Sequence, residues 1–359
     1  MKRLFLLSVV LIIGLTLLLS PRSQATTVIK DGTRCTKLNQ KVTYSKKIYQ
    51  CKKSGSKLVW RFIANVPTPD TKCTLQTSFS SDSRYLWSQE FNEPRGHCPA
   101  SDAWTSLLGD GYQLGLYKYG TDEIELNTAT AAVTDGHGNL VINAIKRNNV
   151  WTSSRIWTQG KFNFLYGKIE IRMKLPTGPY NWPAFWMLGS NYAPPDASQA
   201  DPTWTFGDTP WPNSGEIDIM EGLNCNSEAR ATLHQNAVGS TDQLNGWEGV
   251  SVLAPLSNIS SKFHTFGMRW KPNTIIFTLD GVEYGRDTLN GNQITKIAKG
   301  KIVAKYNTGG IWPFNKPFFL ILNNAVSPYA WGCTTGTSST TLIDWIRYSK
   351  FEGYGTLNP

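Results

Sequence analysis

The sequence is poor in charge, in helical periodicity and in long apolar runs. Only 17% of its 359 residues are charged. No long segment repeats apolar residues at the 3.6-residue period of a helix, and neither heptads nor internal repeats occur, which argues against a helical bundle, a coiled coil or a solenoid. No CxxC pair is present, so a structural zinc site is disfavoured. Beyond residue 20 no apolar stretch is long enough to span a bilayer.

The one long apolar run lies at the N-terminus, over residues 4–20. Two cations precede it, and the small residues Ser23 and Ala25 form a cleavage site after it. This pattern predicts a signal peptide over residues 1–25 and a secreted, extracellular protein. The run is long for a signal and short for a membrane span, so an uncleaved anchor remains the alternative. No cysteine lies near the cleavage site, which disfavours a lipid anchor.

Cysteine is scarce but even in number, with six in the chain. An even count in an exported protein predicts disulfides, and six cysteines allow 15 pairings that sequence alone does not resolve. Proximity along the chain favours Cys35–Cys51 and Cys73–Cys98, which leaves Cys225 for Cys333.

The formal net charge of +10 is unevenly distributed. The predicted signal carries +3, and residues 26–66 hold ten Lys or Arg against one acid, Asp31. The rest of the chain keeps 23 basic and 25 acidic residues and is close to neutral. We therefore expect no nucleic-acid ligand for the main domain. The basic segment predicts attachment to an anionic surface such as a cell wall or an acidic polysaccharide, and a soluble spacer is the alternative.

The composition divides the chain into a small and a large unit. Residues 26–66 contain strand-like VTYSKKIYQC between Cys35 and Cys51, which predicts a small β module stapled by one disulfide. Residues 67–72 form a linker. In residues 73–359, runs such as GKIEIRMKL and IIFTLDGVEY alternate apolar and polar residues, and Gly, Asn or Asp interrupts them. This rhythm predicts an all-β domain built as a two-sheet sandwich.

The segment GEIDIMEG, residues 215–222, carries three acids within six positions. On a strand Glu216 and Asp218 share a face, whereas Glu221 would point away. One β-bulge at Ile219–Met220 would return Glu221 to that face. Ile217 and one of the two bulge residues would then enter the core. The sequence therefore predicts three carboxyl groups in a row on one surface.

Such a row suits glycoside hydrolysis, in which one acid protonates the leaving oxygen and another attacks the sugar or activates water. Crowded carboxylates also separate their pKa values, so that one keeps its proton near neutral pH. A solvated acidic strand and a calcium site are the alternatives. The first fits poorly, because Ile and Met leave no polar opposite face.

The motif EIDIME resembles the E-x-D-x-x-E signature of glycoside hydrolase family 16 in its laminarinase-type form. The resemblance covers residues 84–353 and includes, in family order, LWSQEFN, SSRIWTQGKFNFLYGKIEIRMKLP, WPAFWMLG, FHTFGMRWKPNTIIFTLDG, PFFLILNNAV and TTLIDWIRYSKFEG. It implies a β-jelly-roll sandwich with a concave substrate cleft and a retaining mechanism. Carried onto this chain, Glu216 is the nucleophile, Glu221 the general acid/base and Asp218 the residue that tunes them.

The resemblance also implies substrate contacts for six side chains, namely Trp182, Trp186, His234, Arg155, Asn323 and Glu123. His234 would hydrogen-bond Asp218 or the next sugar, although a strand histidine taken alone is more often structural. At least one of the two tryptophans would form a sugar platform, and the other would belong to the core. Glu125 stands where the family usually has Gln.

No cofactor is expected for the chemistry, but the resemblance implies a structural calcium ion bound by Glu90, the carbonyl of Gly138, and Asp344. Asp344 closing a sheet hydrogen bond is the alternative.

The function implied by the resemblance is that of an endo-β-1,3-glucanase acting on laminarin-like glucan, and we expect a secreted monomer. A mixed-linkage β-glucanase, an agarase-type galactanase and a transglycosylase remain open within the family, and a non-catalytic glucan-binding or cell-wall adhesion protein remains open outside it. The chain departs from the family where subsites are built, for example at Arg269 and in the loop 329–339, so the glycan is left undecided.

Overall fold

The computed structural model describes most of the chain after the predicted signal. The described residues are 29–39, 41–44, 47–65, 73–177, 181–223, 228–236, 247–248, 252–254, 259–308, 312–327 and 336–358. The predicted signal peptide, the linker 67–72, and both Cys225 and Cys333 lie outside these ranges. The limits of the domains therefore stay predictions.

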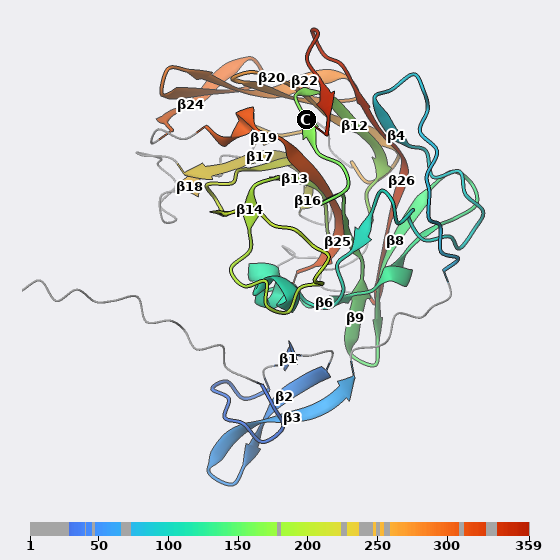
Figure 1. The fold of residues 1–359 in the computed structure, drawn as a ribbon, viewed down its shortest axis with the longest axis vertical. Coiled ribbons are helices and arrows are strands. Elements are labelled where there is room, and N and C mark those ends of the chain that lie inside the picture. The colour runs from blue at the N-terminus through green and yellow to red at the C-terminus, as the bar shows by residue number, and fades with distance from the viewer. Residues whose placement is uncertain are drawn as a thin grey trace, which may run out of the picture.

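Two large, mainly antiparallel sheets make up the main part of the described chain (Figure 1). The ten-stranded sheet has as its main path β18 (Trp247–Glu248), β17 (Glu228–Asn236), β16 (Glu216–Leu223), β13 (Asn181–Gly189), β25 (Phe318–Val326), β10 (Arg155–Trp157) and β5 (Thr105–Ser106). Its flanking strands are β11 (Phe164–Leu165), β19 (Val252–Leu253) and β27 (Thr356–Leu357).

The twelve-stranded sheet runs in the order β24 (Lys301–Asn307), β23 (Gln293–Ala298), β22 (Val282–Asn290), β21 (Thr274–Leu279), β20 (His264–Lys271), β12 (Gly167–Lys174), β26 (Ser338–Ser349), β8 (Leu140–Arg147), β9 (Val150–Ser153) and β6 (Glu125–Asn127). Its flanking strands are β4 (Trp87–Gln89) and β7 (Ala132–Thr134). A parallel pair, β14 (Tyr192–Ala193) and β15 (Thr209–Pro210), stands apart from both sheets.

The helical elements of the described residues are short 3-10 turns. They are η1 (Tyr112–Leu114), η2 (Tyr117–Gly120), η3 (Ala129–Ala131) and η5 (Pro313–Asn315). Within the ranges that the structure describes, no helix combines the length and the apolar character that a membrane span needs.

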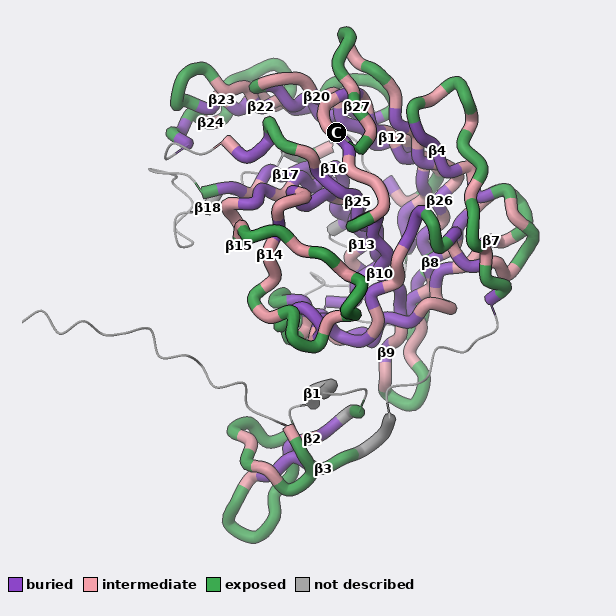
Figure 2. The backbone as a smooth tube through the Cα atoms, in the orientation of Figure 1, coloured by how far each residue is buried: buried purple, intermediate pink, exposed green. Residues whose placement is uncertain are grey.

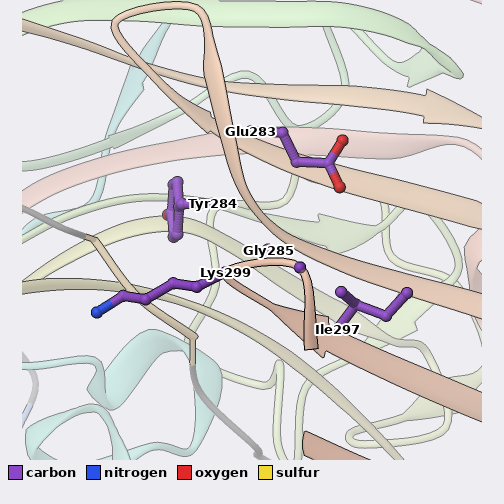
Figure 3. Close-up of a pocket in the computed structure, with 6 residues that line it drawn as sticks. Glu283, Tyr284, Gly285, Ile297 and Lys299 are labelled. Carbon is purple, nitrogen blue, oxygen red and sulfur yellow. The ribbon is translucent and has the colours of Figure 1, made fainter. Parts of the chain in front are cut away.

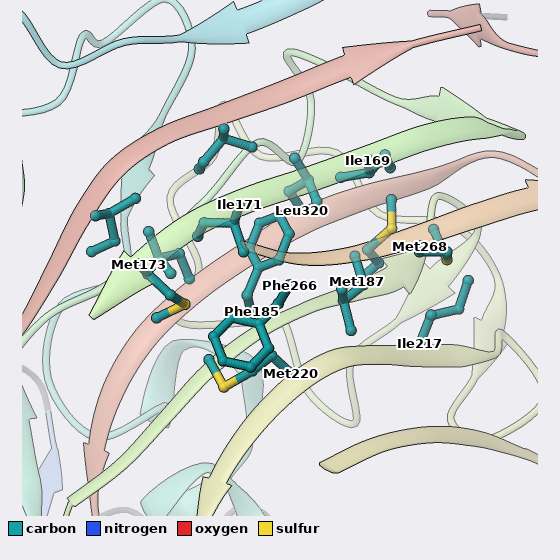
Figure 4. Close-up of a cluster of buried hydrophobic side chains, with 14 of the residues drawn as sticks. Ile169, Ile171, Met173, Phe185, Met187, Ile217, Met220, Phe266, Met268 and Leu320 are labelled. Carbon is teal, nitrogen blue, oxygen red and sulfur yellow. The ribbon is translucent and has the colours of Figure 1, made fainter. Parts of the chain in front are cut away.

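The core lies between the two sheets, where strands such as β12 bury every second side chain and central strands such as β25 are buried throughout. In β12 the pattern GKIEIRMK buries Ile169, Ile171 and Met173 and leaves the intervening residues partly exposed. These side chains meet Phe185 and Leu320 from the other sheet (Figure 4). Burial along the backbone is concentrated in the central strands of both sheets (Figure 2). The predicted all-β sandwich is confirmed.

The N-terminal segment forms its own three-stranded sheet from β1 (Lys41–Tyr44), β2 (Lys47–Ser54) and β3 (Lys57–Asn65). The predicted pairs Cys35–Cys51 and Cys73–Cys98 are both present, and the first staples this sheet. The small sheet has a core of its own formed by Tyr49, Cys51 and Trp60, which are 6%, 0% and 5% exposed.

Candidate active site

Strand β16 carries the predicted bulge. In its pairing with β13, Asp218 lies opposite Trp186 and Glu221 opposite Ala184, so the stretch between the two acids contains one residue more than its partner. The register with β17 shifts at the same place. We expected one bulge residue in the core, but Ile219 and Met220 are both fully buried there. Both apolar residues of the bulge thus point into the core, and Glu221 returns to the face of Glu216 and Asp218.

These three acids define what we call the carboxylate face of the ten-stranded sheet, the side opposite the core. Because residues that lie directly opposite each other on paired strands share a face, the strand register assigns neighbouring side chains to it. They are Arg230, Thr232 and His234 from β17, Trp182 and Trp186 from β13, Asn323 from β25 and Arg155 from β10. All the predicted substrate-binding residues on strands therefore lie on the same face as the acids.

Gly215 allows the strand to begin where it does. Its backbone has φ of +80°, a conformation that glycine adopts without steric cost. A Cβ atom at this position would also lie 2.8 Å from Pro313 and 2.9 Å from Phe318. Glycine is therefore required directly before Glu216, and any side chain there would displace the first acid of the row.

Glu216 and Asp218 share a close set of polar contacts with His234. The His234 Nε2 atom lies 3.0 Å from Asp218 Oδ2 and 3.8 Å from Glu216 Oε1. The indole nitrogen of Trp211 donates a hydrogen bond of 2.9 Å to Glu216 Oε2. The predicted proximity of His234 to Asp218 is confirmed, whereas Trp211 was not anticipated.

Burial changes the acidity of the first two acids. It raises the pKa of Glu216 to about 8; the negative charge of Asp218 acts in the same direction, and His234 opposes it. Burial also raises the pKa of Asp218 well above its ordinary value of 3.8, and Glu221 adds to this shift. The row therefore retains a proton at neutral pH, as general acid catalysis by a carboxyl group requires.

Glu221 is held by donors from both neighbouring strands. Trp182 Nε1 donates to Glu221 Oε1 at 3.0 Å, and Arg230 Nε donates to Oε2 at 3.1 Å. Thr232 Oγ1 lies 3.4 Å from the same Oε2 atom. Trp182 is thus in direct contact with a candidate catalytic acid besides being a candidate sugar platform.

A second polar group lies at the β10 side of the same face. Arg155 donates to both carboxylate oxygens of Glu123 at 2.7 Å, and both side chains are less than 8% exposed. The guanidinium carbon of Arg155 lies 3.8 Å from the ring centre of Tyr119. Burial raises the pKa of Glu125 well above its ordinary value, and the charge of Glu123 contributes. A neutral Glu125 presents a hydrogen-bonding pattern close to that of the glutamine usual in the family.

Asn323 and Trp186 are joined on the carboxylate face by a hydrogen bond of 2.7 Å from Trp186 Nε1 to Asn323 Oδ1. Trp186 is half-buried and packs against a cluster that includes Trp157, Phe319 and Ile321. Both Trp182 and Trp186 remain partly exposed, so neither is a pure core residue.

The candidate calcium ligands lie on strands of the other sheet or next to them. Both carboxylate oxygens of Glu90 accept hydrogen bonds from Arg347, at 3.1 and 2.8 Å, and Asp344 is paired with Arg172. Gly138 has φ of +82°. The two acids thus already have cationic partners, and a calcium ion would have to compete with them for any side-chain oxygen.

Another group in the described residues brings possible metal ligands together. Glu216, Asp218 and His234 each offer one ligand atom, and these atoms lie within 4.8 Å of one another. Their proposed catalytic use requires the same atoms, so we assign no resident metal to them.

A hollow of about 200 Å³ lies on the twelve-stranded sheet and not at the carboxylate face. Glu283, Tyr284, Gly285, Ile297 and Lys299 line it (Figure 3). Glu283 is engaged by Arg286 in a salt bridge of 2.7 Å, so the acid in this hollow already has a partner.

Three residues in contact with the acids escaped the sequence analysis: Trp211, Arg230 and Thr232. The last two had a usable signal, because they alternate with His234 along β17 and so share its face. Trp211 lies outside β16, five residues before Glu216, and no periodicity connects the two.

An all-β sandwich with three carboxyl groups side by side on one sheet face is the arrangement expected of a glycoside hydrolase, and the comparisons with known proteins support this class. The chain belongs to glycosyl hydrolase family 16, because the sequence model of that family matches residues 120–317.

Its relatives extend the similarity over most of the chain. A β-glucanase from Rhodothermus marinus is 29% identical over 294 residues, which cover 78% of this chain and 91% of the relative. A glucan endo-1,3-β-glucosidase from Cryptopygus antarcticus is 32% identical over 251 residues, which cover 67% and 79%. The solved laminarinase catalytic domain from Thermotoga maritima is 32% identical, with a TM-score of 0.56 and coverage of 75% of this chain and 98% of that domain. The predicted family and jelly-roll fold are confirmed.

Proposed function

We propose that this glycoside hydrolase is secreted and cleaves β-1,3-glucan within the chain, with retention of configuration. The observation that carries the proposal is the bulged strand β16, which puts Glu216, Asp218 and Glu221 on one face. The names of its relatives, a glucan endo-1,3-β-glucosidase and a laminarinase, support the linkage. The N-terminal apolar run supports export.

The proposed reaction proceeds in two displacements. In the first, a Glu216 oxygen attacks the anomeric carbon as the glycosidic bond breaks, and Glu221 gives its proton to the departing oxygen. The product is a glycosyl ester of Glu216. In the second, Glu221 removes a proton from a water molecule, which attacks the anomeric carbon and releases Glu216. Each displacement inverts the configuration, so the overall result is retention.

Asp218 and His234 have a positioning role in this scheme. Asp218 lies between the two glutamates on the strand and is 3.0 Å from His234 Nε2. Burial and the charge of Glu221 raise the pKa of the Asp218 carboxyl group well above its ordinary value, while a hydrogen bond with Glu216 acts in the opposite direction. Asp218 therefore couples the protonation of Glu216 to that of Glu221.

The location of the shared proton is the critical point. The proposed roles require an ionised Glu216 and a protonated Glu221, whereas burial raises the pKa of Glu216 to about 8 and so favours its protonated form in the free protein. Transfer of one proton along the row, through Asp218, interconverts the two states. A retaining mechanism needs one acid in each form, so exchanged roles would also be chemically complete.

Gln variants of the two glutamates test the roles. Glu216→Gln and Glu221→Gln should each lower turnover by several orders of magnitude without unfolding the protein. Azide should rescue a small-side-chain variant at position 216 and give a glycosyl azide of inverted configuration. At position 221 the rescued product should keep its configuration. Opposite stereochemistry at the two positions would exchange the roles, and near-normal turnover in both Gln variants would end the assignment.

The glycan is tested by hydrolysis of laminarin, lichenan, agarose and xyloglucan with analysis of the products. Short laminarin oligosaccharides of several lengths are expected from endo cleavage. Preference for lichenan or agarose would favour the mixed-linkage or galactanase alternative. Binding of laminarin without any cleavage would favour a non-catalytic glucan-binding protein.

A further inference from the structure

The small N-terminal sheet has one stapled face and one open face. In the β2–β3 register Tyr49 pairs with Phe62 and Cys51 with Trp60, so these residues share a face. That face is closed by the Cys35–Cys51 disulfide and by the core around Trp60. The intervening residues point to the other side, which we call the open face. Its described side chains are Arg34, Gln50, Lys52, Ser54, Lys57, Val59 and Arg61.

The open face is cationic across three chain segments. Arg34 lies opposite Val59 on β3, and Val59 lies opposite Lys52 on β2, so two exposed cations flank one small apolar residue. Lys57 is exposed at the start of β3, in the hairpin that Figure 2 shows as exposed. Neighbouring strands are about 4.8 Å apart and alternate residues on one strand about 6.7 Å apart. The charges are therefore spaced closely enough to act on one ligand together.

Arg61 lies on this face and makes two polar contacts. Its Nη2 atom donates to Ser54 Oγ at 3.3 Å, and its Nη1 atom donates to Asp31 Oδ2 at 3.2 Å. Asp31 also accepts the backbone N–H of Phe62 at 2.7 Å, which anchors the acid. Asp31 is the single acid in residues 26–66, so the other cations of this face have no acid within the segment to neutralise them.

The described aromatic side chains of the segment do not add to this surface. Tyr49 and Trp60 are buried in the small core, and Phe62 is on the stapled side. Among the described side chains of the open face, the one apolar residue, Val59, is only 8% exposed. The described part of this surface therefore offers charge and hydrogen-bond donors, and its described side chains include no exposed apolar group of the kind that inserts into a membrane.

We propose that the open face of the small sheet is a binding site for an anionic polysaccharide, a chain bearing carboxylate or sulfate groups. Guanidinium and ammonium groups bind such anions by charge-assisted hydrogen bonds. A flat β-sheet face with cations on neighbouring strands complements an extended polymer that carries repeated negative charges. The choice of a polysaccharide over a nucleic acid rests on the proposed function, because the main domain of the same chain acts on a polysaccharide.

The test uses the full secreted chain and two matched double variants. Lys52→Gln with Lys57→Gln removes two charges from the open face. Lys47→Gln with Lys53→Gln removes two charges from the other side of the same hairpin, because Lys47 and Lys53 alternate with Lys52 along β2. Retention is measured on immobilised polygalacturonate and dextran sulfate, with uncharged dextran as the blank, across a salt series. Hydrolysis of soluble neutral glucan is measured in parallel.

The unmodified chain should be retained on both anionic matrices at low salt and released as salt screens the charges. Loss of two exposed cations from the site should weaken binding roughly 2- to 30-fold, if each contact has the strength of an exposed ion pair. The stapled-side variant should stay close to the unmodified chain, and both variants should hydrolyse neutral glucan normally.

Three results would overturn the inference. They are absence of retention at low salt, equal weakening by the two double variants, and tighter binding to duplex DNA or to anionic phospholipid vesicles than to the polysaccharides at equal salt. A chain that is retained but fails to hydrolyse any glucan would refute the proposed function and leave this site intact.

Discussion

Arg230 places a cation 3.1 Å from Glu221, and replacing it by Gln is expected to shift the pH dependence of hydrolysis. In a bell-shaped profile of kcat/KM, the acid limb reports ionisation of the nucleophile and the alkaline limb reports loss of the proton from the general acid. Removal of a cation favours the protonated form of the carboxyl group beside it. If Glu221 is the acid, the alkaline limb of Arg230→Gln moves to higher pH.

The size of the shift follows from the geometry. Two unit charges 3.1 Å apart interact by about 1.3 kcal/mol in bulk water and about 5 kcal/mol at an effective dielectric constant of 20. The side chain of Arg230 is 30% exposed and that of Glu221 is 9% exposed, so the lower part of this range applies. We expect about 1.5–3 kcal/mol, which corresponds to a displacement of about 1–2 pH units.

The assay is the kcat/KM profile of both proteins on a soluble glucan that the unmodified enzyme hydrolyses. Arg269→Gln is the matched control: the subsite position expected for Arg269 is wrong, because it lies on β20 of the twelve-stranded sheet, not on the sheet that carries the acids, and donates to the carbonyl of Gly281. Its limbs should not move. Displacement of the acid limb alone in Arg230→Gln would assign Glu221 as the nucleophile, and an unchanged profile would refute the coupling altogether.

Three further outcomes are expected. Lys296→Met should lower the free energy of unfolding by about 3–5 kcal/mol at neutral pH. Lys296 Nζ lies 3.1 Å from Asp287 Oδ2 and both side chains are fully buried, so the substitution leaves the Asp287 charge uncompensated. Burial already raises the pKa of Asp287, so this loss should shrink as the pH falls, and adding Asp287→Leu should restore most of it; denaturant titrations at two pH values measure both. Mass mapping of the non-reduced protein should find Cys225 joined to Cys333, and free thiols at both positions would refute this. Calcium should raise the Tm and EDTA lower it, and Glu90→Gln should remove the difference; the same Tm with and without calcium in the unmodified chain would exclude the site.

Much of the candidate site could be predicted because it depends on local spacing. Alternation on a strand assigns Glu216 and Asp218 to one face, and the requirement that Glu221 join them already implied the bulge. The Cys35–Cys51 and Cys73–Cys98 disulfides followed from proximity along the chain. The sandwich followed from the period-two pattern of segments such as β12.

The sequence could not assign protonation states, because these depend on burial and on neighbours from distant segments. The raised pKa of Glu216 comes mainly from its burial. The raised pKa of Glu125 comes from its burial together with the nearby charge of Glu123. Likewise, the contact of Trp211 with Glu216 is made by a residue outside the catalytic strand, where no periodicity applies.

By itself, then, the sequence determined the family, the strands and the identity of the three acids, because these depend on residues close together in the chain. Only the tertiary structure decided what surrounds the acids and which side of the basic segment is open. Arg230 and Trp182 reach Glu221 from two different strands, and Arg34 joins Lys52 on one face only through the pairing of both segments with β3. Such contacts arise from strand order and register, which fix distances between residues that the chain itself leaves far apart.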